Sequence, residues 1–215
     1  PPRSTLFPYT TLFRSNRPFG KITFEPVHGT LTVSDAVLHH GRTAPLSSWI
    51  HPARVSWPLP GKQTDVFRRG EDGYHTCRIP ALAVTSSGTL LAFCEGRRNS
   101  ASDHGDIDLL LKRSLDGGRT WSPATVVYGE PGDVTIDNPV PVVDRMTGIV
   151  WLAFCRNNER VFVTNSSDDG VTWCPPEEIT ASVRRPEWAS WYATRPGPGI
   201  QLSSGRLVIP ANHGI

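Results

Sequence analysis

Short apolar runs that meet at a glycine recur along the second part of the chain. Residues 80–94 hold two such runs on either side of Gly88, and residues 139–155 repeat the arrangement around Gly148. A weaker third copy spans residues 199–211 around Gly205, so the three glycines lie 60 and 57 residues apart. A glycine between two short apolar runs is typical of a hairpin turn that needs a positive φ. The pattern predicts three β-hairpins, repeated at the interval found in propellers.

A second repeat, of the form S-x-D-x-G-x-T-W, lies between these hairpins. Its copies span residues 114–121 and 166–173. Strand-like runs flank them, at 108–112 and 124–128 for the first copy and at 160–164 and 177–179 for the second. In such a turn the Asp accepts backbone N–H bonds, the Gly adopts a left-handed conformation and the Trp packs beneath the hairpin. A hairpin plus two strands joined by this turn makes a four-stranded blade. The residues expected to build the two turns are Ser114, Asp116, Gly118, Trp121, Ser166, Asp168, Gly170 and Trp173.

Composition and charge agree with an all-β fold and narrow the function. The 19 Gly and 20 Pro among 215 residues favour many turns and few long helices. A formal net charge of +2 gives no reason to expect a nucleic-acid partner. No stretch approaches the ~18 apolar residues of a membrane span. The four cysteines show no C-x-x-C spacing, so we expect mostly buried thiols and neither a zinc site nor a disulfide framework.

The chain divides into three parts by sequence character. Residues 1–15 show no sustained period and resemble a translated sequencing-library adapter, so we interpret them as a non-native segment. Residues 16–60 contain one alternating segment, at 21–25, and are an unassigned N-terminal extension. Residues 61–215 carry the repeats and predict a partial β-propeller of about three blades.

The octapeptide repeat is the Asp-box, and a further motif stands before its first copy. Arg78-Ile79-Pro80 resembles the R-I-P motif of the exo-α-sialidases (neuraminidases) of the glycoside hydrolase family 33 type. Asp103, which follows Arg78 by 25 residues, and the segments 91–97, 137–139 and 191–202 support the resemblance, which covers residues 63–215. It implies the N-terminal half of a six-bladed ring. It also implies an enzyme that releases terminal sialic acids from sialylated glycans with retention, without a cofactor or metal.

The resemblance implies roles for Arg78 and Asp103. A sialic acid glycoside carries a carboxylate beside the scissile bond, and the planar guanidinium of Arg78 can bind it through paired hydrogen bonds. Asp103 would be the general acid and base. The first repeat is nine residues longer than the second, and these polar residues lie within 95–105, around Asp103; such insertions often carry function. Asp106 and Asp108 remain alternative acids, and an ion pair with a neighbouring acid remains the alternative for Arg78.

Four more residues match family positions that contact the sugar: Arg97, Asp137, Asn138 and Tyr192. Each has a structural alternative. Arg97 could form a surface ion pair, Asp137 and Asn138 could cap a turn, and Tyr192 could pack between two neighbouring tryptophans.

The resemblance also implies a tyrosine nucleophile, a glutamate that activates it and two more arginines, all in later blades. We expect these beyond residue 215, so the chain by itself is expected to be inactive. A non-catalytic Asp-box propeller that binds carbohydrate or another protein is the main alternative, and a trans-sialidase or another Asp-box glycosidase is a third. A secreted or periplasmic location suits the full-length parent, but the sequence does not decide it. The linkage and acyl form of the sugar also stay open.

Overall fold

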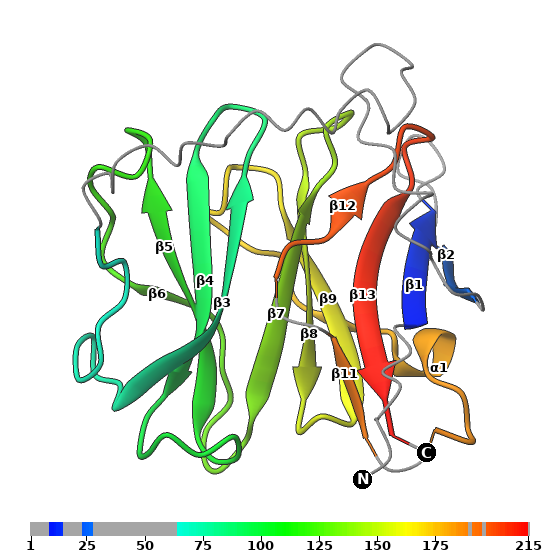
Figure 1. Ribbon diagram of the computed structural model, residues 1–215, viewed down its shortest axis with the longest axis horizontal. Helices are drawn as coiled ribbons and strands as arrows, with labels where there is room; N and C mark the ends of the chain where they lie inside the picture. The colour runs from blue at the N-terminus through cyan, green and yellow to red at the C-terminus, as the bar shows by residue number, and fades with distance from the viewer. Residues whose placement is uncertain (1–8, 15–22, 28–63, 189–190, 195–196, 215) are drawn as a thin grey trace, which may run out of the picture.

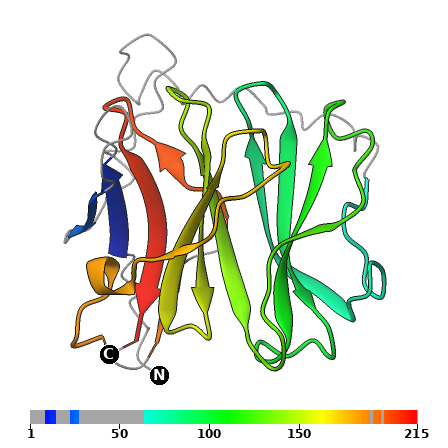
Figure 2. The same cartoon turned by 180° about the vertical axis from the view of Figure 1, so that it is seen from behind.

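The computed structural model describes residues 9–14, 23–27, 64–188, 191–194 and 197–214, which form three antiparallel sheets (Figure 1). The first sheet has the order β3 (Thr76–Val84), β4 (Leu90–Arg97), β5 (Ile107–Ser114) and β6 (Thr125–Tyr128). The second repeats it with β7 (Ile136–Val143), β8 (Val150–Arg156), β9 (Arg160–Ser166) and β10 (Glu177–Glu178). Figure 2 shows the same sheets side by side from behind. The prediction of an all-β partial propeller with four-stranded blades is confirmed.

The third sheet begins with the predicted hairpin around Gly205. Its strands are β11 (Tyr192–Thr194) and β12 (Ile200–Gln201), which both pair with β13 (Leu207–His213). The other edge of β13 pairs with β1 (Tyr9–Arg14), which in turn pairs with β2 (Thr23–Val27). The N-terminal parts that we set aside or left unassigned therefore contribute two strands. The proposed division of the chain at residues 15 and 60 stays a prediction.

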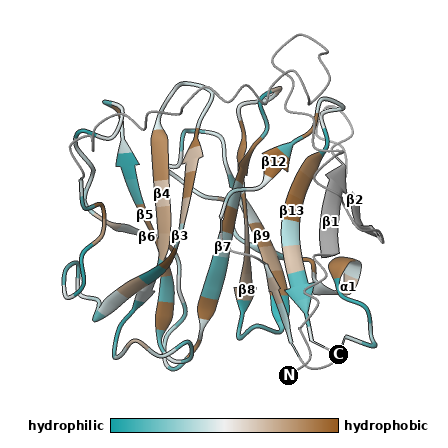
Figure 3. Cartoon of the chain, viewed as in Figure 1, coloured by the Kyte–Doolittle hydropathy of each residue, from teal (hydrophilic) through white to brown (hydrophobic). Residues whose placement is uncertain are grey.

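Apolar side chains on alternate strand positions join the sheets through two cores. The core between the first and second sheets contains Leu91, Phe93, Leu109, Leu111, Ile136, Val150, Leu152 and Phe154. The core between the second and third sheets contains Val140, Val142, Ala153, Cys155, Trp188, Tyr192, Leu207 and Ile209. In Figure 3 the upper part of β13 is hydrophobic and its lower end hydrophilic. The polar end of β13 is therefore not part of this apolar core.

Both Asp-box turns close as their sequence predicts. Oδ1 of Asp168 accepts the backbone N–H of Val171 (3.0 Å) and Thr172 (2.9 Å), and Oδ2 accepts the Thr172 hydroxyl (2.5 Å). These bonds lower the pKa of Asp168 to about 2. Asp116 makes the same bonds in the first turn, which also lower its pKa. The ring of Trp173 packs edge-on against Phe93 of the first sheet, with centroids 5.8 Å apart. The second turn therefore also helps to join the first two blades.

The inner strands β3 and β7 each contain a bulge at the same place. The pairing register shifts between Arg78 and Ala81 in β3 and between Asp137 and Val140 in β7. The residue after the first position of each bulge has a left-handed φ, 54° at Ile79 and 56° at Asn138. A proline follows in both strands, where the bulge removes the need for a ladder N–H. Arg-Ile-Pro and Asp-Asn-Pro thus form the same bulge at equivalent positions of successive blades.

The four cysteines are all free thiols. Cys94 and Cys155 are buried and Cys77 is half-buried, but Cys174 is exposed because it directly follows the second Asp-box turn. We expected mostly buried thiols, and Cys174 is the exposed exception. Within the described residues the single helix, α1 (Thr180–Val183), is four residues long, and no helix there could cross a membrane. No cluster of metal-ligating side chains occurs in this part of the chain.

Candidate active site

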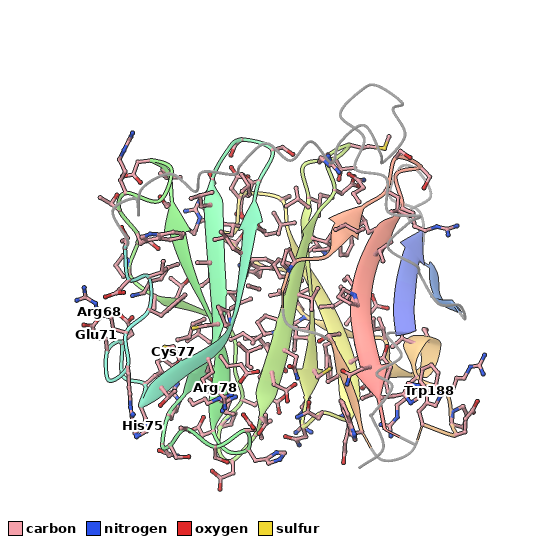
Figure 4. All side chains as sticks on the ribbon, viewed as in Figure 1. Arg68, Glu71, His75, Cys77, Arg78 and Trp188 are labelled. Carbon is pink, nitrogen blue, oxygen red and sulfur yellow. The ribbon has the colours of Figure 1, made fainter. Side chains whose placement is uncertain are left out.

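A cavity of about 290 Å³ lies at one end of the inner strands, where Figure 4 labels Arg78. The Asp-box turns lie at the opposite end of the sheets, since Leu90 of β4 pairs with Ser114 whereas Glu95 pairs with Arg78. All three sheets contribute to the lining. Five of the six predicted catalytic and binding residues line the cavity: Arg78, Arg97, Asp103, Asp137 and Asn138.

Arg78 and Asp103, predicted from separate signals, bind each other. Arg78 Nη1 lies 2.8 Å from Asp103 Oδ1, although one residue comes from the bulge in β3 and the other from the loop between β4 and β5. The side chain of Arg78 is 46% exposed and that of Asp103 is 68% exposed, so the guanidinium and the carboxylate can both reach a ligand. Arg78 thus does form an ion pair with a neighbouring acid, as its structural alternative stated. That acid is Asp103, the residue predicted to be the general acid.

Arg97 is a buried organiser of this pair and not a surface ion pair. Only 3% of its side chain is exposed, and its Nη1 lies 2.7 Å from Asp103 Oδ1. The same nitrogen donates to the carbonyls of Ala101 (2.7 Å) and Ser102 (2.9 Å). Two guanidinium groups, Arg97 first and Arg78 second, therefore hold the pKa of Asp103 below its ordinary value.

Glu95 connects Arg97 to the second blade. Its Oε2 accepts Nε (3.1 Å) and Nη2 (2.6 Å) of Arg97, and its Oε1 accepts the backbone N–H of Asn138 (3.0 Å). Glu95 is almost fully buried, and burial raises its pKa against the opposing effect of these bonds. This residue therefore fixes the β7 bulge and the Arg97 side chain at once.

Asp137 is a buried carboxyl group that lines the cavity. It is 3% exposed, and neither oxygen has a hydrogen-bond partner in the described part of the chain. Burial and the nearby Glu95 carboxylate raise the pKa of Asp137 to about 8, an effect that the neighbouring Asn138 side chain offsets only in part. Asp137 is thus mainly neutral at pH 7 and can donate a hydrogen bond.

Besides the bond from its N–H to Glu95, Asn138 makes two further hydrogen bonds. Its Nδ2 donates to Oδ1 of Asn158 (3.0 Å), and its carbonyl accepts the hydroxyl of Thr194 (2.6 Å). These contacts connect the bulge of β7 to the turn between β8 and β9 and to β11. In the described residues neither Asn138 nor Asp137 caps a turn through its side chain, so the turn-capping alternative does not apply to them.

The structure places Tyr192 outside the cavity. Tyr192 is 3% exposed and stacks on Trp188 in the core, with ring centroids 6.1 Å apart. Its neighbour Trp191 lines the cavity instead. The two alternative acids also lie elsewhere: Asp106 forms an ion pair with Arg98, and Asp108 is buried. Of the three candidate acids, Asp103 alone lines the cavity in the described part of the chain.

Sequence reasoning assigned no role to several residues that line the cavity. They are Ile79, Glu95, His104, Asn158, Trp191, Ala193, Thr194 and Asn212. Some carried a signal, since Ile79 lies within the Arg-Ile-Pro motif and Trp191 within a segment that supports the resemblance. Asn158 and Asn212 gave none, because their place in the cavity depends on how three sheets pack.

Four-stranded blades and Asp-box turns define an Asp-box β-propeller unit, and its cavity is lined by paired guanidinium and carboxyl groups. Residues 88–215 match the family described as the BNR repeat-like domain, and the chain belongs to this family. It is 36% identical to an exo-alpha-sialidase of Arthroderma benhamiae over 170 residues, which cover 65% of this chain and 41% of the relative. The chain thus spans about two fifths of the curated relatives that it matches first.

Solved structures agree with this relationship. A Hadza microbial sialidase is 30% identical, with a TM-score of 0.64 over 68% of this chain and 34% of that one. A Trypanosoma rangeli sialidase, described in complex with sialic acid, shares the fold at 16% identity, with a TM-score of 0.61 over 73% of this chain and 31% of its own. The resemblance to exo-α-sialidases of the family 33 type is confirmed.

Proposed function

We propose that this chain supplies the acid and one carboxylate-binding arginine of an exo-α-sialidase that acts on sialylated glycans. The observation that carries the proposal is the 2.8 Å contact between Arg78 and Asp103 at the cavity. The relatives named as sialidases, and the Trypanosoma rangeli sialidase in complex with sialic acid, support the substrate class.

Arg78 is suited to bind the carboxylate of the sugar. Its guanidinium is half exposed at the cavity and already binds a carboxylate, that of Asp103. A substrate carboxylate is the same chemical group and competes for the same N–H donors. Arg97 remains bound to Asp103 and to the buried Glu95, so it keeps the acid in place during this exchange.

The exchange also gives Asp103 the protonation state that a general acid needs. With both guanidinium groups beside it, the pKa of Asp103 is low and the carboxylate is ionised. When Arg78 turns to the substrate, Asp103 loses one cation and gains an anionic neighbour, and both changes raise its pKa. Asp103 can then protonate the leaving oxygen, and the resulting carboxylate can later take a proton from the attacking water.

Asp137 completes the sugar-binding side of the proposed site. Its unpaired carboxyl lies in the cavity and is largely neutral, so it can donate to or accept from a hydroxyl or N-acyl group. The tyrosine nucleophile, its glutamate and two more arginines are not assigned to this chain. The proposed retaining reaction takes them from the later blades that the resemblance implies.

The test is turnover of a fluorogenic sialoside by a complete protein that contains this sequence. We expect Asp103→Asn to lower kcat by roughly 100-fold to 10,000-fold, the usual contribution of a general acid. Asp106→Asn is the matched control, because Asp106 lies close by in the chain but outside the cavity, and it should keep most of the activity. Sialoside binding without hydrolysis would indicate the non-catalytic module, and unchanged turnover in Asp103→Asn would remove the proposed acid.

A further inference from the structure

The loop that carries Asp103 is held at its far end by a residue of the second blade. Thr135, just before β7, is 2% exposed and is not among the residues that line the cavity. Its hydroxyl accepts the N–H of Gly105 (3.0 Å) and donates to the carbonyl of the same residue (3.1 Å). One buried hydroxyl thus binds both backbone groups of a residue two positions after Asp103.

Thr135 is itself fixed by the turn between β8 and β9. Its N–H donates to Oδ1 of Asn157 (3.0 Å), and the N–H of Asn157 donates to the Thr135 carbonyl (2.8 Å). Ile107, the first residue of β5, donates its N–H to the carbonyl of Val134 (3.1 Å) and forms a parallel bridge with Thr135. The second blade therefore holds both the end of the loop and the start of the strand that follows.

Gly105 needs this support because of its conformation. Its φ is 133°, a value that residues other than glycine rarely adopt. Gly105 also has no side chain that could anchor the loop. Arg97 binds the other part of the loop through the carbonyls of Ala101 and Ser102. Asp103 lies between these two anchors, so a shift at Gly105 moves its carboxyl relative to Arg97.

We propose that Thr135, supported by Asn157, is a positioning residue that holds the Asp103 carboxyl between Arg78 and Arg97. Thr135 acts through the backbone of the loop and does not touch the cavity. The catalytic meaning of this position rests on the proposed function, but the contacts themselves belong to the chain whatever reaction it serves.

The test compares Thr135→Val, which keeps the shape but removes the hydroxyl, with Thr135→Ser, which keeps the hydroxyl. Carbon-13 NMR of the Asp103 carboxyl, assigned with Asp103→Asn, reports its pKa. We expect this pKa to rise toward the ordinary aspartate value in Thr135→Val and to stay low in Thr135→Ser. Amide exchange at residues 99–106 should become about tenfold faster in Thr135→Val alone, as expected when buried hydrogen bonds are lost.

A merely structural role would lower the stability of the whole chain without changing the pKa of Asp103 in the folded state. The proposal is wrong if Thr135→Val leaves that pKa and the loop exchange unchanged, or if Thr135→Ser behaves like Thr135→Val. If Thr135→Val does not fold, Asn157→Gly provides the same test, because glycine tolerates the φ of 56° at this position and removes the acceptor for the Thr135 N–H.

An activity measurement separates this proposal from the proposed function. In a complete protein that contains this sequence, Thr135→Val should lower kcat and leave KM nearly unchanged, since Thr135 does not touch the cavity. If the protein hydrolyses no sialoside, the proposed function fails, yet the pKa and exchange results still decide whether Thr135 positions Asp103.

Discussion

Arg78 and Asp137 occupy the same position in successive blades. Each is the last paired residue before the bulge of an inner strand, and each precedes a residue with a left-handed φ and then a proline. The same backbone device therefore presents a permanent cation from one blade and a largely neutral carboxyl from the next. At Ile79 this conformation is unusual, because a β-branched residue at positive φ is strained. Strain of this kind gathers at functional sites, in agreement with the place of both bulges at the cavity.

Asp137 should make the stability of the chain fall as the pH rises. Its pKa is about 8 in the folded chain, far above the value for an exposed aspartate, so the folded state binds a proton that the unfolded state releases. The stabilisation is complete below about pH 4 and is lost as the pH rises to about 8. Asp137→Asn should reduce the slope of the free energy of unfolding between pH 5 and pH 7.5 by up to about 1.4 kcal/mol per pH unit.

Urea unfolding of both proteins at several pH values measures this difference. Glu95 also has a raised pKa, but it is present in both proteins and its effect largely cancels in the comparison. Equal slopes for wild type and Asp137→Asn would show that Asp137 is ionised in the folded chain.

Arg78 and Arg97 should respond differently to lysine. Arg97 is buried and uses its fork of donors on Glu95, Asp103 and two loop carbonyls, which a lysine cannot match. We expect Arg97→Lys to lower the free energy of unfolding by about 2 kcal/mol or more. Arg78→Lys should change it by less than about 1 kcal/mol, since the Arg78 pair is exposed.

Urea unfolding of the two variants measures this contrast, and each serves as the control for the other. In a complete protein, Arg78→Lys should instead raise KM for a sialoside, because the paired hydrogen bonds to the carboxylate are lost. Equal stability losses would contradict the assignment of an organising role to Arg97 and a binding role to Arg78.

The sequence predicted those parts of the fold that depend on local patterns. The glycine-centred hairpins and the Asp-box turns each lie within one stretch of chain, and their strands appear where the pattern indicated. Asp103 could be found because the first repeat is longer than the second. The links that Glu95 and Thr135 make across the blades could not be predicted, because each is a hydrogen bond to the neighbouring blade, at Asn138 and Gly105.

Tyr192 shows a second limit of sequence reasoning. Trp191 lies just before β11 and lines the cavity, whereas Tyr192, the first residue of β11, is buried in the core. The family pattern indicated this segment but not which of the two residues lines the cavity. That choice is made by the core between the second and third sheets, where Trp188 stacks on Tyr192.

Two glycines with similar φ should differ in how they tolerate alanine. Gly117 has a φ of 72° with no atom within 4 Å of an added Cβ, whereas at Gly170, with a φ of 79°, a Cβ would lie 3.1 Å from Leu91 Cδ2. Gly117→Ala should cost about 1–2 kcal/mol for the left-handed conformation alone. Gly170→Ala should cost about 1–3 kcal/mol more, because it also crowds the packing between the first two blades. Chemical unfolding measures both, and equal costs would mean that Leu91 yields without loss of packing.

Trp191 and Tyr192 offer the sharpest test of which of these two neighbouring side chains contacts the ligand. Tyr192→Ala removes a stacked core ring and should lower the free energy of unfolding by about 3 kcal/mol or more. Trp191 is 38% exposed, so Trp191→Ala should cost less stability but should weaken sialoside binding to a complete protein. Unfolding curves together with KM values for both variants decide the matter. A stable Tyr192→Ala protein with a raised KM would return Tyr192 to the cavity, as the family resemblance implied.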